Sequence, residues 1–206
     1  GLLVSNEVIK SRASILVENL TKWGNSHIVV TNNDPAHFAQ AGITFDVIVV
    51  DAPCSGSGLF RKDPDAIAEW SLDHVQHCSL RQQRILNDIM PSLNENGVLI
   101  YATCSYSQEE DEMMADWLMS SGEFEALAVS IPKDWNIVET FSEKNNAPGY
   151  RFYPDQLKGE GFFIAAFRKK SPATAVGKGK SASLKLPQKQ ELEQIYNFLP
   201  VSESFY

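Results

Sequence analysis

Three residues that could do chemistry directly follow two strongly apolar segments. Asp51 and Cys54 belong to FDVIVVDAPCSGSG at residues 45–58, and Cys104 belongs to LIYATCS at residues 99–105. Buried parallel strands read as continuous apolar runs, and open α/β sheets place their chemistry just beyond the carboxyl ends of such strands. We therefore expect one carboxylate and two thiols at the same edge of one sheet.

The surroundings of these two cysteines favour a reactive role. A thiolate is a strong nucleophile when its pKa is lowered or a base is near, whereas an inert cysteine is a small buried hydrophobe. Pro53 stiffens the turn before Cys54, the glycines that follow allow a ligand to approach, and hydroxyl residues flank Cys104. Cys78 lies in an expected helix beside an apolar residue, which favours a structural role.

Acidic residues also follow strands at Glu7, Asp34 and Asp51. A carboxylate at the end of a strand in such a sheet can accept the hydroxyls of a cofactor ribose, and a neighbouring one can accept an adenine amino group. The alternative is that each acid only solvates the start of a loop. Three acids in register favour a cofactor site, although a phosphate-binding glycine loop is absent from the sequence.

Other site chemistries have less support. A redox pair of Cys54 and Cys104 is an alternative, but the two are far apart in sequence and form no CxxC motif. His74, His77 and Cys78 share a helical region with a spacing that is common by chance, so we expect no metal. Serine and histidine hydrolase triads have no counterpart.

Composition limits the partners. The net charge of −8 is unevenly distributed, because residues 161–190 hold seven basic and no acidic residues. If the partner is a nucleic acid, much of the electrostatic attraction must come from this segment or from parts outside the chain. No apolar run reaches the roughly 20 residues of a membrane span, and an odd count of three cysteines favours reduced thiols in the cytoplasm.

Hydrophobic periodicity predicts an α/β fold: a largely parallel sheet with helices on its faces and a C-terminal antiparallel hairpin. Ser71 is the expected N-cap of the second helix, Gly24 the C-cap of the first, and Ser107 with Glu110 a capping box. The expected strands cover residues 2–7, 27–31, 47–50, 98–103, 124–130, 150–153 and 161–167, and the expected helices residues 9–23, 71–90 and 107–120.

The motifs DAPCSGSG at 51–58 and TCS at 103–105 together resemble the NOL1/NOP2/Sun family of RNA cytosine-5 methyltransferases. RKDPDA at 61–66, SYSQEEDE at 105–112 and RFYPDQLKGEGFF at 151–163 extend the resemblance over residues 1–170. It implies a Rossmann-like class I methyltransferase core, S-adenosyl-L-methionine as cofactor, and RNA, of the small ribosomal subunit, as substrate. A binding module without catalysis remains an alternative.

The resemblance also implies a role for each central residue. Cys104 would add to carbon 6 of the cytosine, and Cys54 would act in the elimination that releases the enzyme. Asp51 would hydrogen-bond the pyrimidine at N3 or at its amino group, and would also border the cofactor pocket. The target base must be single-stranded or flipped out of its stack, because a paired base cannot be reached.

The remaining candidates are contacts to cofactor and substrate. Glu7 matches the family's ribose-binding acid and Asp34 its adenine-side acid. Pro53, Arg61 and Lys62 are the substrate-contact candidates, the two basic residues through phosphate groups. Exposed basic side chains can also serve only solvation.

The resemblance further implies that the chain is a piece of a larger enzyme. The family's first strand and its glycine-rich cofactor loop are expected to be missing, so the chain alone should bind cofactor weakly and be inactive. Residues 1–170 would be a partial catalytic domain, 171–189 a basic flexible linker, and 190–206 the start of a C-terminal RNA-binding domain. Unpaired strand edges would then favour rearrangement or self-association.

Overall fold

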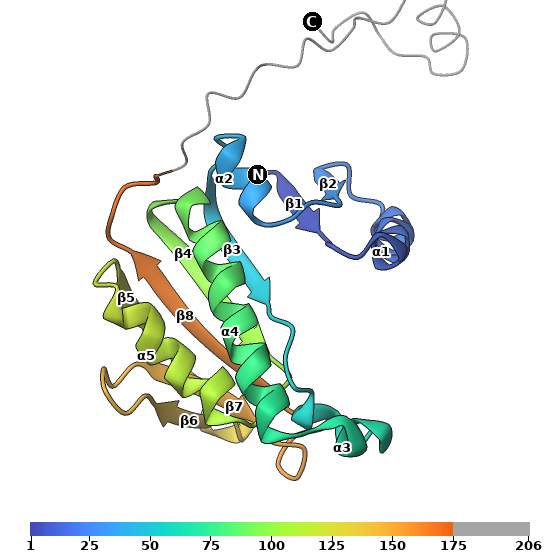
Figure 1. Ribbon diagram of the computed structural model, residues 1–206, viewed down its shortest axis with the longest axis vertical. Helices are drawn as coiled ribbons and strands as arrows, with labels where there is room; N and C mark the ends of the chain where they lie inside the picture. The colour runs from blue at the N-terminus through green and yellow to red at the C-terminus, as the bar shows by residue number, and fades with distance from the viewer. Residues whose placement is uncertain (175–206) are drawn as a thin grey trace, which may run out of the picture.

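A computed structural model describes residues 1–174 as an α/β protein. Most of the expected linker and the whole expected C-terminal segment therefore lie outside the described residues. Five α-helices and eight strands follow one another along the described chain (Figure 1): β1 Leu3–Asn6, α1 Lys10–Trp23, β2 Ile28–Thr31, α2 Ala36–Gln40, β3 Phe45–Asp51, α3 Asp65–Glu69, α4 Leu72–Ile89, β4 Leu93–Thr103, α5 Glu112–Ser120, β5 Phe124–Leu127, β6 Val138–Phe141, β7 Pro148–Phe152 and β8 Phe162–Lys169.

The strands form two sheets. Strands β1 and β2 pair in parallel by themselves, while the larger sheet has the order β3-β4-β8-β7-β6, with β5 also beside β8. In the larger sheet only β3 and β4 are parallel, because β8 runs antiparallel to β4, β5 and β7. The α/β class and the C-terminal hairpin of β7 and β8 are confirmed. The larger sheet is mixed rather than largely parallel as expected, because β8 returns directly beside β4 and antiparallel to it.

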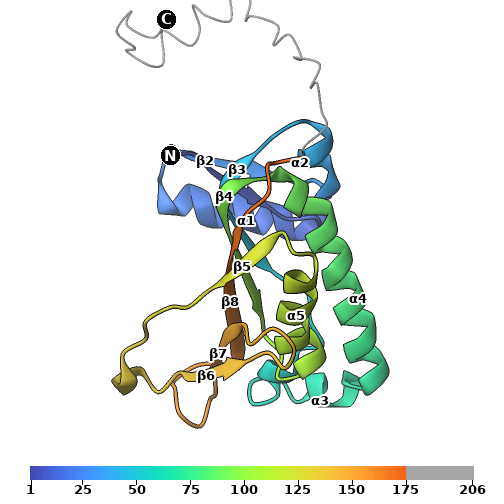
Figure 2. The same ribbon diagram turned by 90° about the vertical axis from the view of Figure 1, so that its left-hand side faces the viewer.

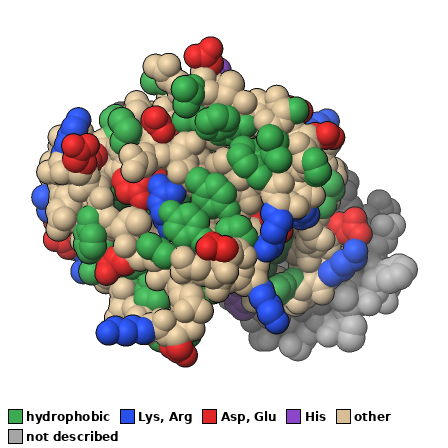
Figure 3. Space-filling view, turned by 90° about the horizontal axis from the view of Figure 1, so that it is seen from below, with side chains coloured by type: hydrophobic (Ala, Val, Ile, Leu, Met, Phe, Trp, Pro, Cys, Tyr) green, Lys and Arg blue, Asp and Glu red, His purple; other side chains and the backbone are tan. Residues whose placement is uncertain are grey.

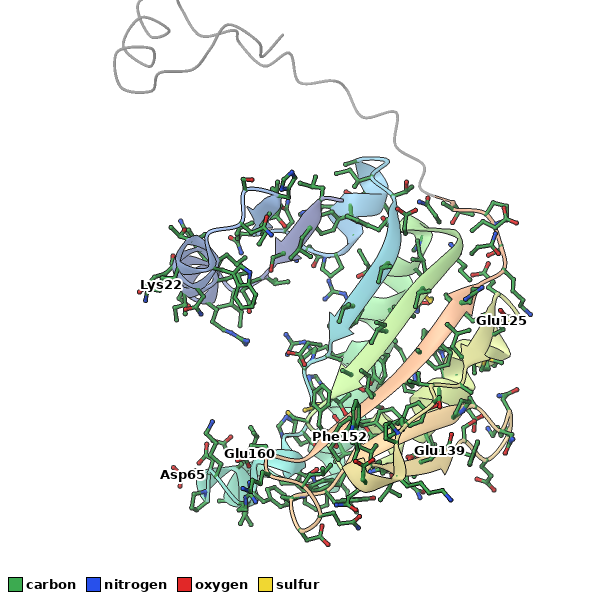
Figure 4. The ribbon with its side chains drawn as sticks, turned by 180° about the vertical axis from the view of Figure 1, so that it is seen from behind. Lys22, Asp65, Glu125, Glu139, Phe152 and Glu160 are labelled. Carbon is green, nitrogen blue, oxygen red and sulfur yellow. The ribbon has the colours of Figure 1, made fainter. Side chains whose placement is uncertain are left out.

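The two sheets do not join. Among residues 1–174, β1 pairs only with β2, and β3 pairs only with β4. Figure 4 shows the ribbon of β1 and β2 standing apart from the exposed edge of β3. Each of these edges presents unpaired backbone groups, the arrangement that favours pairing with another strand. Self-association through these edges stays a prediction.

One face of the larger sheet carries the core. Helices α4 and α5 both lie on this face in Figure 2, and the most deeply buried apolar side chains gather between them and the sheet. Strand β3 shows the asymmetry: Ile48 and Val50 are buried, whereas Val47 and Val49 on the opposite face are 54% and 64% exposed. Strand β3 is thus a one-sided strand that alternates with period two.

Several local expectations are confirmed. The Ser71 hydroxyl accepts a hydrogen bond from the His74 N–H at 3.1 Å and begins α4. Gly24 ends α1 with a left-handed φ of 73°, and its N–H donates to Leu20 and Thr21 carbonyls. Among residues 1–174 we find no helix with both the length and the apolarity to cross a bilayer.

Other local expectations were wrong. The strand expected at residues 98–103 begins earlier, at Leu93, and its register against β3 shifts between Phe45 and Val47. Asn96 has a φ of 63°, and a Cβ on Gly97 would lie 2.8 Å from the Asn94 carbonyl oxygen. The short elements α2, α3 and β6 had no sequence-based expectation, since four or five residues carry too little periodicity.

Candidate active site

The two thiols expected at one sheet edge are in direct contact. Strands β3 and β4 are parallel neighbours with Asp51 opposite Ala102, so the loops that follow them leave the sheet together. This brings Cys54 Sγ within 2.7 Å of Cys104 Sγ. Both cysteines are half-buried and free, and Asp51 is exposed beside them.

The contact shifts the pKa values of the two thiols in opposite directions. The hydrogen bond that Cys104 accepts from Cys54 lowers the pKa of Cys104, while burial and the Asp51 carboxylate oppose this shift. The same hydrogen bond, followed by burial, raises the pKa of Cys54. The pair therefore favours a thiolate on Cys104 and a proton on Cys54.

Backbone hydrogen bonds tie three loops together around the thiols. The Gly58 N–H donates to the Cys104 carbonyl at 2.8 Å, and the Gly161 N–H donates to the Gly58 carbonyl at 2.9 Å. A Cβ on Gly58 would lie 2.7 Å from the Cys104 carbonyl oxygen, inside any ordinary contact. Glycine is required here because the neighbouring backbone comes so close.

A buried polar cluster lies beneath the cysteine loops, and the sequence did not predict it. Glu110 is fully buried and receives hydrogen bonds from Ser55, Ser105 and Gln82. The expected capping box was wrong: Ser107 begins a short 3-10 helix at 108–110 without a side-chain cap, and α5 begins only at Glu112. The signal in the sequence was the run of four acidic residues at 109–112, of which Glu110, Asp111 and Glu112 are buried.

A buried ionic cluster supports the other side of the Cys104 loop. Arg151 donates to Glu112 at 2.7 and 2.5 Å, contacts Asp111 at 3.0 Å, and donates to the Tyr106 carbonyl at 3.1 Å. Asp111 in turn accepts from Thr103 at 2.6 Å. Burial raises the pKa of the Asp111 carboxyl to about 8, although Thr103 and Arg151 act in the opposite direction.

The two acids expected to bind cofactor lie on the smaller sheet. Glu7 follows β1 and accepts from the Ile9 N–H at 2.9 Å, with Arg12 at 3.1 Å. Asp34 follows β2 and binds Arg84 of α4 at 2.8 Å. Both side chains are half-buried. No hydrogen bond or ion pair within residues 1–174 joins either acid to Asp51 or to the cysteines, so the structure gathers only the thiols and Asp51.

The three substrate-contact candidates lie on the chain that follows β3, in different settings. Arg61 is exposed, binds the Gly159 carbonyl and lies 3.3 Å from the Pro154 carbonyl. Its side chain therefore connects the chain after β3 to the loop between β7 and β8. Lys62 is exposed, and its side chain forms no hydrogen bond or ion pair within residues 1–174. The Pro53 carbonyl accepts from Gln82 at 2.9 Å, which makes Pro53 part of the loop's support.

Aromatic side chains surround this end of the sheet. Tyr106 and Tyr153 stack with ring centroids 5.7 Å apart, and Phe152 contacts Phe162 edge-on. In Figure 4 the labelled Phe152 and Glu160 lie at the same end as α3. Seen from that end, Figure 3 shows hydrophobic side chains gathered in the middle of the surface with Lys or Arg among them. This surface offers both apolar and cationic contacts.

A family model described as 16S rRNA methyltransferase RsmB/F matches residues 1–168. The chain belongs to this family. Ribosomal RNA small subunit methyltransferase F of Aeromonas hydrophila is 33% identical, and the match covers 100% of this chain and 45% of that protein. Its namesake in Vibrio cholerae is 34% identical over 94% of this chain and 41% of that protein.

A solved structure agrees with these relatives. The crystal structure of NSun6 from Pyrococcus horikoshii with SFG matches with a TM-score of 0.71 and 28% identity, over 83% of this chain and 42% of that chain. The methyltransferase fold and the family resemblance that the cysteine motifs indicated are thereby confirmed. This RsmB/F family chain spans less than half the length of the relatives it matches.

Of the alternatives to a methyltransferase site, the redox pair is not excluded by distance in this RsmB/F chain, because the Cys54 and Cys104 sulfurs are 2.7 Å apart in the fold. Within residues 1–174, no group of three or more histidine, cysteine, aspartate or glutamate side chains could hold a metal ion. Cys78 is buried in α4, as its apolar surroundings indicated.

Proposed function

We propose that the protein transfers a methyl group from S-adenosyl-L-methionine to carbon 5 of a cytosine in RNA, through a covalent bond between Cys104 and carbon 6. The observation that carries this proposal is the 2.7 Å contact of the two thiols beside Asp51. Membership of the 16S rRNA methyltransferase family supports ribosomal RNA of the small subunit as the substrate and the cytoplasm as the location.

Cys104 begins the reaction as the nucleophile. Carbon 5 of cytosine is a poor nucleophile, and addition of a thiolate to carbon 6 makes it enamine-like. The hydrogen bond from Cys54 lowers the pKa of Cys104, which favours its thiolate form. Asp51 would hold the pyrimidine at N3 or at its amino group, which stabilises the adduct.

Three carboxylates would hold the cofactor. Glu7 would hold the ribose hydroxyls and Asp34 the adenine side, with Asp51 at the border of the pocket. A carboxylate has about four lone-pair sites, so the intramolecular contacts of Glu7 and Asp34 leave acceptor capacity on both. When bound, S-adenosyl-L-methionine supplies the methyl group as an electrophile at a sulfonium centre.

Cys54 completes the reaction. Its hydrogen bond to Cys104 is the largest cause of its raised pKa, and this cause disappears when the Cys104 sulfur is bonded to carbon 6. Cys54 can then lose its proton to solvent and accept the proton from carbon 5. The electron pair of that C–H bond restores the C5–C6 double bond, the C6–S bond breaks, and Cys104 leaves as a thiolate.

The half-buried thiols and the exposed Asp51 beside them suit an extruded base. An unpaired or flipped cytosine would enter beside Pro53, with phosphates near Arg61 and Lys62 and neighbouring bases against the ring of Tyr106. Residues 1–170 would then be the catalytic part, and the basic segment that follows would connect it to further RNA-binding residues.

Trapping on RNA tests the proposal with the protein at the full length that its gene encodes. Cys54→Ala should accumulate a covalent complex with small-subunit ribosomal RNA, because release is blocked, whereas Cys104→Ala should form none. Wild-type protein is the control for turnover, and methylated cytosine is read by bisulfite sequencing. Equal trapping by the two variants, or none by either with its RNA, would show that the roles are wrongly assigned.

A further inference from the structure

One buried carboxylate bonds to the residue after each cysteine. Glu110 is 0% exposed, and its Oε1 accepts the Ser55 N–H at 2.8 Å. Its Oε2 accepts the hydroxyl of Ser55 at 2.5 Å and that of Ser105 at 2.6 Å. Ser55 follows Cys54 and Ser105 follows Cys104, so a single side chain connects the two cysteine loops.

The carboxylate is itself fixed by the core. Gln82 of α4 donates from Nε2 to Glu110 Oε1 at 3.1 Å and to the Pro53 carbonyl at 2.9 Å. The Tyr101 hydroxyl of β4 lies 2.9 Å from Gln82 Oε1 and 2.6 Å from the Glu110 carbonyl. Gln82 and Tyr101 are both fully buried. Helix α4 and strand β4 therefore hold Glu110 in one place.

The chemistry of the cluster calls for an acceptor with several lone pairs. Four donors converge on Glu110: one backbone N–H, two hydroxyls and one amide. An ionised carboxylate accepts about four hydrogen bonds and donates none. Its charge is unfavourable for the nucleophile, since the carboxylate acts to raise the pKa of Cys104. The benefit of Glu110 must therefore be geometric.

We propose that Glu110 is the positioning residue that holds the thiols of Cys54 and Cys104 in contact. The catalytic meaning of this contact rests on the proposed function, but the contact itself can be measured without substrate. A misplacement of about 1 Å can cost on the order of a hundredfold in rate, so removal of this link should affect kcat far more than KM.

The thiol contact is measured as the rate at which Cys54 and Cys104 form a disulfide. Diamide takes one hydrogen from each thiol and is reduced to the hydrazide as the S–S bond forms. The protein is used at the full length that its gene encodes, and the cross-linked peptide pair is quantified by mass spectrometry. A shorter or better-held thiol distance gives a faster reaction.

Three variants and one control give the result. Glu110→Ala should slow disulfide formation by about tenfold or more and lower kcat by on the order of a hundredfold. Glu110→Gln keeps the size and the hydrogen bonding, because serine hydroxyls can also accept, and should restore the disulfide rate to near wild type. Ser105→Ala removes one link and should be intermediate, which keeps the test informative if Glu110→Ala does not fold.

The control is Lys169→Met, a change of another fully buried charged side chain. Lys169 donates to the Met90 and Leu93 carbonyls, away from the cysteine loops. If Lys169→Met slows disulfide formation as much as Glu110→Ala, the effect is general destabilisation and the proposal fails. It also fails if Glu110→Ala leaves the disulfide rate unchanged, or if Glu110→Gln is as slow as Glu110→Ala.

A second measurement, the pH dependence of Cys104 alkylation, responds to the charge of residue 110 rather than to folding. Glu110→Gln removes the negative charge that opposes the Cys104 thiolate, so the pH midpoint of Cys104 alkylation by iodoacetamide should fall. An unchanged or higher midpoint would contradict the arrangement. If wild-type protein methylates no RNA, the proposed function fails, while the disulfide and alkylation rates still decide the role of Glu110.

Discussion

The buried Arg151 should be among the most stabilising charged residues of the described chain. Its side chain is 5% exposed and contacts Glu112, Asp111 and the Tyr106 carbonyl. Arg151→Met keeps much of the apolar length of the side chain but leaves buried carboxyl groups without their cation. Removing one partner of a buried ion pair costs about 3–5 kcal/mol, a large share of the roughly 5–15 kcal/mol that stabilises a typical domain.

The assay is urea unfolding, followed by circular dichroism. With a slope of about 2 kcal/mol per molar urea, a loss of about 3–5 kcal/mol lowers the midpoint by roughly 1.5–2.5 M. The matched control is Arg168→Met on the neighbouring strand β8, where the guanidinium is 45% exposed and 3.8 Å from Glu125. Such an exposed pair contributes at most about 1 kcal/mol.

Two outcomes would contradict the reasoning. The first is a midpoint that falls no further for Arg151→Met than for Arg168→Met. The second concerns the double variant with Glu112→Met: since an apolar replacement of a whole buried pair is often neutral, it should regain part of the loss. If the double variant is less stable than Arg151→Met alone, the penalty does not come from an unpaired carboxylate.

Three further predictions concern single positions. Gly58→Ala should cost about 1–3 kcal/mol through overpacking and slow disulfide formation at Cys104, whose carbonyl is too close for a Cβ. Gly122→Ala, which strains a left-handed φ of 72° without a close neighbour, is the control for backbone strain that does not act on the cysteine loops. In the folded protein the pKa of Asp111 is raised to about 8, so its contribution to stability is complete below about pH 4 and is lost as the pH rises to about 8. Asp111→Asn should therefore abolish the fall in urea midpoint between pH 5 and pH 8. An equal fall in wild type and in Asp111→Asn would refute this prediction. Ser71→Ala should lower the free energy of unfolding by about 1 kcal/mol by removing the N-cap of α4. Ser71→Asp should retain most of that stability, because aspartate also caps helices. An unchanged melting temperature for Ser71→Ala would count against the cap.

Local patterns were enough for the elements that are long or clearly punctuated. Strands β3 and β4 carry continuous apolar runs, and Ser71 and Gly24 cap their helices as expected. In each case the deciding interaction joins residues that are near in sequence. Short elements such as β6 were not predicted, because packing, rather than local periodicity, places them in the sheet.

The sequence by itself determined that Asp51, Cys54 and Cys104 share one sheet edge, because parallel strands end on the same side. Only the tertiary structure decided that the two sulfurs touch, since that contact joins residues 50 positions apart. It also decided that Glu110 turns inward to residues of both cysteine loops, 55 positions back at Ser55, instead of capping a helix. A buried carboxylate is stable only where enough donors converge, and that convergence is a property of the folded chain.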